Sequence, residues 1–106
     1  MRAGELRHRI TIQEPVETLD SLKTPVLSWQ DVATVWAAVE PLRGREYLEV
    51  KNTNTELSAR IRIRYRRGIN PSMRVKYGSR IFNIESVIDF EERHREIHLM
   101  CSEVFE

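Results

Sequence analysis

The chain has 106 residues, a hydrophobic fraction of 41%, a charged fraction of 31% and a formal net charge of +1. These values predict one globular domain over residues 1–106 and exclude a disordered chain, which would be less apolar. They also exclude a strong overall attraction to nucleic acid or anionic membrane. Charge is nevertheless segregated, because residues 57–84 carry basic but no acidic side chains, whereas every acidic residue after position 56 lies in residues 85–106.

Cys101 is the single cysteine, so an intramolecular disulfide is impossible and a Cys-based zinc site is not expected. We expect Cys101 to be a small buried hydrophobe. The first ten residues lack the apolar segment of a signal peptide, and no apolar run approaches the ~20 residues of a membrane helix. We therefore expect a protein made in the cytoplasm, without a membrane partner.

In chain order, residues 7–13 are predicted to form a strand that Pro15 ends, and residues 17–25 a loop. Residues 27–39 read as a long strand with two fairly apolar faces, which predicts a central or covered position. Trp29 and Trp36 lie in this stretch and are expected to pack in the core. Trp29, close to the loop, has the alternative role of a partner anchor.

Residues 43–51 are the only helical candidate, and a helix this short needs tertiary packing. Residues 56–66 show the cleanest alternation in the chain, with Ile61, Ile63 and Tyr65 opposite a row of arginines. Only a strand turns successive side chains to opposite faces in this way.

Residues 72–77, 80–88 and 94–104 complete the predicted strands, with Gly78 and Ser79 as a tight hairpin turn. About six strands joined by short connections predict an all-β, mainly antiparallel fold. We expect a small barrel with one short helix, since a barrel removes exposed sheet edges.

No catalytic or cofactor motif is apparent, because the glycines are scattered singly rather than gathered in a phosphate-binding loop. His94, Glu96 and His98 share one face of the last predicted strand and have the donor types of a metal site. A solvated face of mixed charge is the favoured interpretation, because no further ligand is clustered with them. We therefore predict neither an enzyme nor a metal or cofactor site.

The arginine row is the most distinctive surface feature. Its members, with two basic residues of the next strand, are Arg60, Arg62, Arg64, Arg66, Arg74 and Lys76. Three interpretations stay open: a subunit interface, phosphate contact, and a solvated face neutralised by glutamates of the same chain. The interface is favoured, and Tyr65 on the opposite face argues against a base-stacking platform.

The chain resembles the phage head–tail joining proteins, the head-completion or stopper adaptors of siphophages. The segments that carry the resemblance stand in order: MRAGELRHRI with Thr11-Ile12-Gln13, then Trp29, Val35 to Leu42, Gly44-Arg45-Glu46, Ile61 to Ile69, Met73-Arg74-Val75 and Tyr77 to Ile84. Together they span nearly the whole chain, although no one segment is diagnostic.

The resemblance implies a structural protein of the virion, assembled in the host bacterial cytoplasm, that joins the head to the tail and closes the DNA channel after packaging. It implies a ring of twelve copies beneath the portal and its adaptor, with the tail on the other side. A monomer before assembly is a separate expectation, which the resemblance does not supply. The resemblance implies no activity, cofactor or specific DNA binding. The arginine row is therefore expected to face a neighbouring subunit or the outside, because a DNA channel should not hold phosphate tightly.

The two long irregular segments expected over residues 15–26 and 41–56 are the predicted partner-binding loops. The contact residues predicted in or near them are Leu19, Leu22, Trp29, Arg43, Arg45, Glu46 and Tyr47. Two alternative functions of the protein stay open. One is a tail-completion or terminator protein, which shares ring symmetry and barrel architecture. The other is a small nucleic-acid-binding barrel, supported by the basic stretch.

Overall fold

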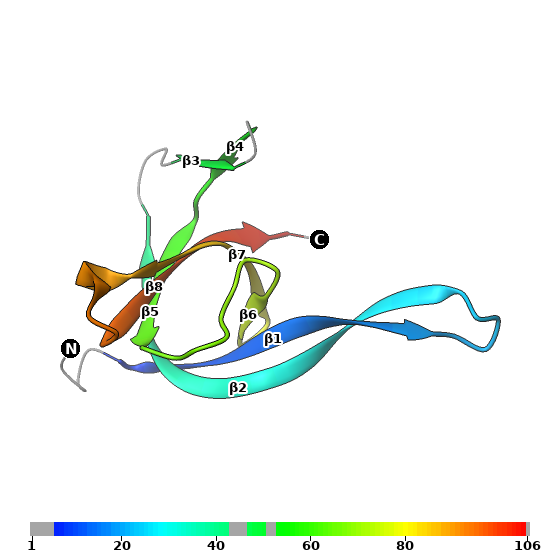
Figure 1. Ribbon diagram of the computed structural model, residues 1–106. Coiled ribbons are helices and arrows are strands. Elements are labelled where there is room, and N and C mark those ends of the chain that lie inside the picture. The colour runs from blue at the N-terminus through cyan, green and yellow to red at the C-terminus, as the bar shows by residue number, and fades with distance from the viewer. Residues whose placement is uncertain (1–5, 43–46, 51–52, 106) are drawn as a thin grey trace.

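The structure is a computed structural model that describes residues 6–42, 47–50 and 53–105, with backbone alone for 47–50, 53–56 and Phe90. Six antiparallel strands form a closed barrel in the order β1-β2-β5-β8-β7-β6. Their bounds are β1 His8–Leu19, β2 Pro25–Pro41, β5 Ala59–Arg64, β6 Arg74–Tyr77, β7 Arg80–Asp89 and β8 Glu96–Val104. The ring closes where Thr11–Gln13 of β1 pair with β6 (Figure 1). The predicted six-stranded, all-β fold is confirmed.

The barrel interior is filled by alternate residues of each of the six strands, as the period-2 patterns predict. On β5, Ile61 and Ile63 are almost wholly buried. The core cluster also contains Ile10, Ile12, Ala37, Ala59, Met73, Val75, Phe82, Ile84, Ile97, Leu99 and Cys101. Aliphatic side chains from every barrel strand thus remove the inner surface from water, which is the main favourable term for folding.

The first hairpin extends far beyond the barrel as a two-stranded ribbon (Figure 1). Pairing of β1 with β2 continues as far as Leu19 opposite Pro25, although β1 pairs with β6 only up to Gln13. The predicted stop at Pro15 and the predicted loop over 17–25 are therefore wrong, and only residues 20–24 turn. Pro15 is tolerated because β1 is an edge strand at this point, where a missing N–H removes no bond to the barrel. We call residues 14–30 the ribbon.

A β-bulge marks the place where the ribbon leaves the barrel. Ile12 lies opposite Ala33, whereas Gln13 lies opposite Asp31, so Val32 is the extra residue of β2. A bulge bends its strand and increases the local twist. The bulge therefore gives a physical reason why the hairpin turns away from the closed sheet at Gln13.

The predicted helix over 43–51 is wrong where the structure describes it. Tyr47–Val50 form β3, which pairs antiparallel with β4, Thr53–Glu56, as a separate two-stranded sheet. Residues 43–46 and 51 lie outside the described part of the chain. A helix of this length is marginal by itself, and Val50, Thr53 and Thr55 are β-branched residues that favour strands.

The β6–β7 and β7–β8 connections are short. The β6–β7 hairpin turns at Gly78, whose φ of +60° is readily adopted by glycine. Between β7 and β8, η2 (Phe90–Glu92) is a short helical turn, and Glu91, Glu92 and His94 all have φ near +55°. β8 begins at Glu96 rather than at the predicted His94. No helix in the described residues has the length and apolarity to span a membrane.

Candidate interaction surfaces

The ribbon carries exposed apolar side chains toward its tip. Leu22 is 83% exposed, and Leu19, Val26 and Leu27 are also exposed. Asp20 fixes the turn, because its Oδ1 accepts hydrogen bonds from the backbone N–H groups of Leu22 at 2.8 Å and Thr24 at 2.9 Å. Leu19 and Leu22, predicted as partner contacts, thus lie at the tip of the ribbon, far from the barrel core.

A polar cluster fixes the root of the ribbon to β6. The Nε of Arg74 donates to Oε1 of Gln13 at 2.7 Å, and Nε2 of Gln13 donates to Oδ1 of Asp31 at 2.8 Å. The Arg74 guanidinium also lies over the Trp29 ring, 4.2 Å from its centre. Arg74 and Trp29, both predicted to meet partners, therefore contact each other within one chain. Their predicted roles at interfaces stay predictions.

The arginine row lies on the outer face of the barrel, with Arg60, Arg62 and Arg64 projecting from β5 and Arg66 beyond its end. Arg62 forms an ion pair with Glu40 of β2, Nε to Oε1 at 2.9 Å. Across the other edge of β5, Arg62 lies opposite His98 and Arg64 opposite Glu96. The row therefore stands between carboxylates of its own chain, and its charge is partly neutralised there.

The structure separates His94 from Glu96 and His98, with which it was predicted to share a strand face. Nε2 of His98 lies 2.8 Å from Oε1 of Glu96, and both side chains are nearly buried on the outer face of β8. His94 lies apart from them, because it precedes the strand, pairs with Asp89 at 3.0 Å and packs edge-on against Tyr65. Among the described residues, no group of three or more His, Cys, Asp or Glu side chains is placed to hold a metal ion.

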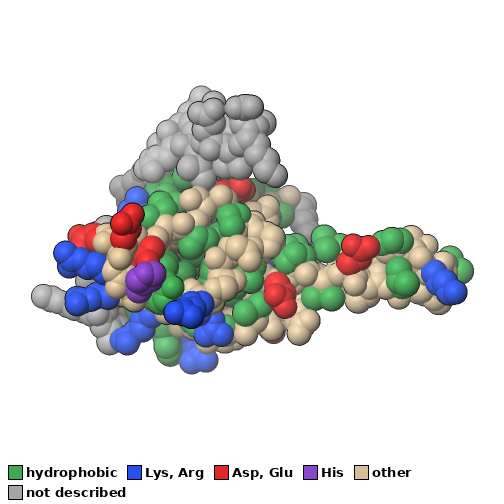
Figure 2. All heavy atoms as spheres, in the orientation of Figure 1, with side chains coloured by type: hydrophobic (Ala, Val, Ile, Leu, Met, Phe, Trp, Pro, Cys, Tyr) green, Lys and Arg blue, Asp and Glu red, His purple; other side chains and the backbone are tan. Residues whose placement is uncertain are grey.

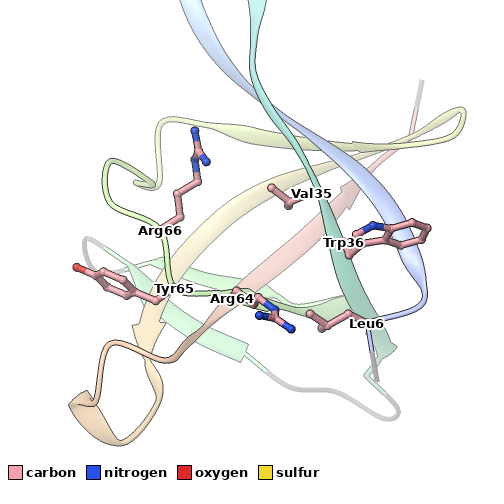
Figure 3. Close-up of a pocket in the computed structure, with 6 residues that line it drawn as sticks. All are labelled: Leu6, Val35, Trp36, Arg64, Tyr65 and Arg66. Atoms are coloured by element: carbon pink, nitrogen blue, oxygen red, sulfur yellow. The ribbon is translucent and has the colours of Figure 1, made fainter. Parts of the chain in front are cut away.

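Beside the row lies an apolar groove of about 300 Å³ (Figure 3). It opens where β2 and β5 separate, because their pairing ends at Ala37 opposite Ile63. Its lining residues are Leu6, Val35, Trp36, Arg64, Tyr65 and Arg66. Apolar side chains thus line most of the groove, and the guanidinium-bearing side chains of Arg64 and Arg66 are exposed beside it.

The predicted core position of Trp36 is wrong, since its side chain is 51% exposed. Val35 and Ala37 face the barrel interior, so Trp36 faces out. Arg9, directly opposite on β1, places its guanidinium 5.1 Å from the centre of the Trp36 ring. The polar Thr34 on the same face was the sequence signal for exposure. No sequence pattern indicated the groove, because Leu6, Trp36 and Arg64 meet only through the barrel topology.

The remaining predicted contact residues are mostly outside this region. Lys76 is exposed on the outer face of β6. Arg43, Arg45 and Glu46, together with the side chain of Tyr47, lie outside the described part of the chain. Since Lys76 is not among the residues that line the groove, it adds no charge there.

Cys101 is fully buried in the core cluster, as predicted. Burial among aliphatic side chains raises the pKa of its thiol to about 12, with a smaller contribution from the charge of Glu85. Its Sγ donates to the backbone carbonyl of Leu99 at 3.4 Å. The thiol is thus a packing group with almost no thiolate at neutral pH.

Comparison with solved structures agrees with this architecture. A protein of Shigella flexneri 2a, whose structure was determined in solution, is 30% identical and has a TM-score of 0.74 over 100% of this chain and 99% of that chain. A chain in the virion of a native gene transfer agent particle is 24% identical, with a TM-score of 0.66 over 95% of this chain and 97% of that chain. This second likeness shows a shared fold.

The search of curated proteins found no match. The sequence model of the phage head completion protein family, in contrast, matches residues 1–104, which is nearly the whole chain and every barrel strand. The chain therefore belongs to the phage head completion protein family and has a structural role in completion of the phage head.

Proposed function

We propose that the protein joins the completed head to the tail and closes the DNA channel after packaging. In this proposal a ring of twelve copies binds the portal or adaptor ring on one side and tail proteins on the other. The protein is a monomer in the host cytoplasm before assembly, and it has no catalytic activity. The observation that carries the proposal is the ribbon, which presents apolar side chains well away from the barrel core.

The physical argument rests on the stability of such a hairpin. A two-stranded ribbon without a third strand is at best marginally stable in water, and exposed apolar side chains such as Leu22 and Leu27 gain from burial. A partner surface would supply that burial. A protein with a projecting, apolar-tipped hairpin is therefore well suited to bridge neighbouring proteins in an assembly.

The barrel surface supports passage of DNA without tight binding. Arg62 is paired with Glu40, and Arg64 stands opposite Glu96. Carboxylates at these positions repel phosphate and reduce the counterion release that drives nonspecific DNA binding. The same feature argues against the nucleic-acid-binding alternative, which predicts tight, salt-sensitive DNA binding by the isolated protein.

The test is electron microscopy of particles assembled without this protein. Separate tails beside heads that have lost their DNA are the expected result. Filled, stable heads beside overlong or ragged tails would instead assign the protein to the tail-terminator class. Normal, infectious particles would refute the proposal, and expression of the intact chain from a plasmid controls for effects on neighbouring genes.

A further inference from the structure

The groove is lined by residues that precede β1 and end β5, and the ribbon tip projects from the opposite side of the barrel (Figure 1). Arg9 lies opposite Trp36 at the root of the hairpin, and Leu19 lies opposite Pro25 near the tip. Ten residues of extended strand separate Arg9 from Leu19, which is roughly 33 Å at about 3.3 Å per residue. Because the same hairpin carries both sites, the tip of one chain cannot fold back onto its own groove.

The tip combines apolar and acidic side chains. Leu19, Leu22 and Leu27 are exposed there, and Figure 2 shows how the ribbon stands out from the rest of the molecule. The ribbon contains Glu14, Glu17 and Asp20 but only one basic residue, Lys23. Three carboxylates against one ammonium group make the ribbon acidic, although the whole chain carries a net charge of +1.

The groove has the opposite chemistry. Leu6, Val35 and Trp36 supply an apolar lining, and Arg64 and Arg66 add exposed guanidinium groups (Figure 3). A volume of about 300 Å³ corresponds to roughly ten water molecules at ~30 Å³ each. Apolar side chains that enter would release this water, and acidic side chains beside them would meet the arginines.

We propose that the ribbon tip of one copy binds in the groove of the next copy, and that this contact repeats around the ring. The leucines would fill the groove while Glu17 pairs with an arginine beside it. Such a contact joins two different surfaces, so it propagates from copy to copy and closes a ring when the rotation allows. The inference rests on the ring proposed above and specifies which surfaces build it.

Charge reversal tests the pairing in assembled particles. Glu17→Arg and Arg66→Glu, each supplied in place of the intact protein, are expected to lower the yield of infectious particles roughly tenfold or more. This is the effect of about 1.4 kcal/mol on a single equilibrium. The double variant Glu17→Arg/Arg66→Glu restores the opposite charges and should recover most of the yield. Both residues are exposed, so the fold is expected to persist, and thermal unfolding of each variant verifies this.

Matched controls place the same charges elsewhere. Ser79 lies exposed in the β6–β7 turn, outside both surfaces, so Ser79→Glu and Ser79→Arg should leave the yield unchanged. A double variant no better than the single variants would contradict the proposed pairing.

Disulfide trapping tests the contact directly. In a Cys101→Ala background, Leu22→Cys with Arg64→Cys keeps Arg66 in place and should give a ladder of covalent multimers from oxidised particles, because each chain links to two neighbours. Leu22→Cys with Ile88→Cys is the control, since Ile88 is 45% exposed but lies on the outer face of β7, away from the groove. This control pair should give no ladder.

The outcomes separate this inference from the proposed function. If removal of the protein separates heads from tails, but the trapped pair gives no ladder and the double reversal no recovery, the ribbon does not bind a neighbouring copy and only this inference fails. If removal leaves normal particles, the proposed function fails and the inference fails with it.

Discussion

The guanidinium of Arg74 on β6 lies 4.2 Å from the centre of the Trp29 ring on β2 while its Nε donates to Gln13 of β1. Three strands thus meet at the bulge where the ribbon leaves the barrel. The bulge bends the hairpin, and the Arg74 cluster fixes its root to the third strand. The direction in which the ribbon points is therefore set by contacts within one chain.

Replacement of Arg74 by Met should loosen this junction. The nearly buried Oε1 of Gln13 loses its donor, and Trp29 loses its cation, so the free energy of unfolding should fall by about 2 kcal/mol. Urea unfolding measures the change, and hydrogen exchange should accelerate in residues 14–30. Lys76→Met is the control, because Lys76 lies exposed on the same strand. Equal stability of the two variants would show that the cluster contributes nothing.

Gly78→Ala should destabilise the β6–β7 hairpin. Gly78 has a φ of +60°, and an added Cβ would meet nothing within 4 Å, so the cost is conformational rather than steric crowding by neighbours. A residue with a Cβ is disfavoured in this region by about 1–2 kcal/mol. Thermal unfolding should show a loss of that size, whereas Gly78→Asn should lose less, because asparagine tolerates the left-handed region. A stable alanine variant would contradict the assigned turn.

Cys101 should resist thiol reagents in the native protein. With a pKa of about 12, only about one thiol in ten thousand is ionised at pH 8, and the group is fully buried. Labelling by a thiol-reactive dye should be complete in denaturant and negligible without it. Fast labelling under native conditions would show that β8 opens readily.

The same thiol makes stability depend on alkaline pH. Its pKa in the folded state is raised from 9.0 to about 12, so between these values the unfolded chain ionises while the folded chain retains the proton. The folded state then binds more protons, and its stability falls as pH rises through this window, by up to about 1.4 kcal/mol per pH unit. Cys101→Ala should remove this part of the alkaline loss, as measured by urea unfolding at a series of pH values.

Arg62 and Arg66 should respond differently to charge reversal, although they belong to the same row. Arg62→Glu replaces the partly exposed ion pair with Glu40 by two neighbouring carboxylates and should reduce stability by about 1 kcal/mol. Arg66 is exposed beyond the end of β5, so Arg66→Glu should change stability by less than about 0.5 kcal/mol. Urea unfolding of both variants distinguishes a structural member of the row from one available to a partner. Similar losses would mean that Arg66 also has an essential partner within the chain.

Alternation in the sequence determined the all-β fold, because a strand that buries one face needs an apolar residue at every second position. The pattern of Ile61 and Ile63 against Arg60, Arg62 and Arg64 predicted the two faces of β5 correctly, and Gly78 located a hairpin turn. The apolar character of Cys101 predicted its burial. Each of these properties depends on a few neighbouring residues, so it can be read locally.

Only the tertiary structure decided where the strands stop and which surfaces meet. Pro15 is compatible with a strand because β1 has become an edge there, and Trp36 faces out because the barrel lies on its other side. The groove and the Arg74 cluster unite residues far apart in the chain, such as Leu6 with Tyr65 and Gln13 with Arg74. Local propensity depends on residues that are near in sequence. These contacts form only when the barrel closes, so propensity does not predict them.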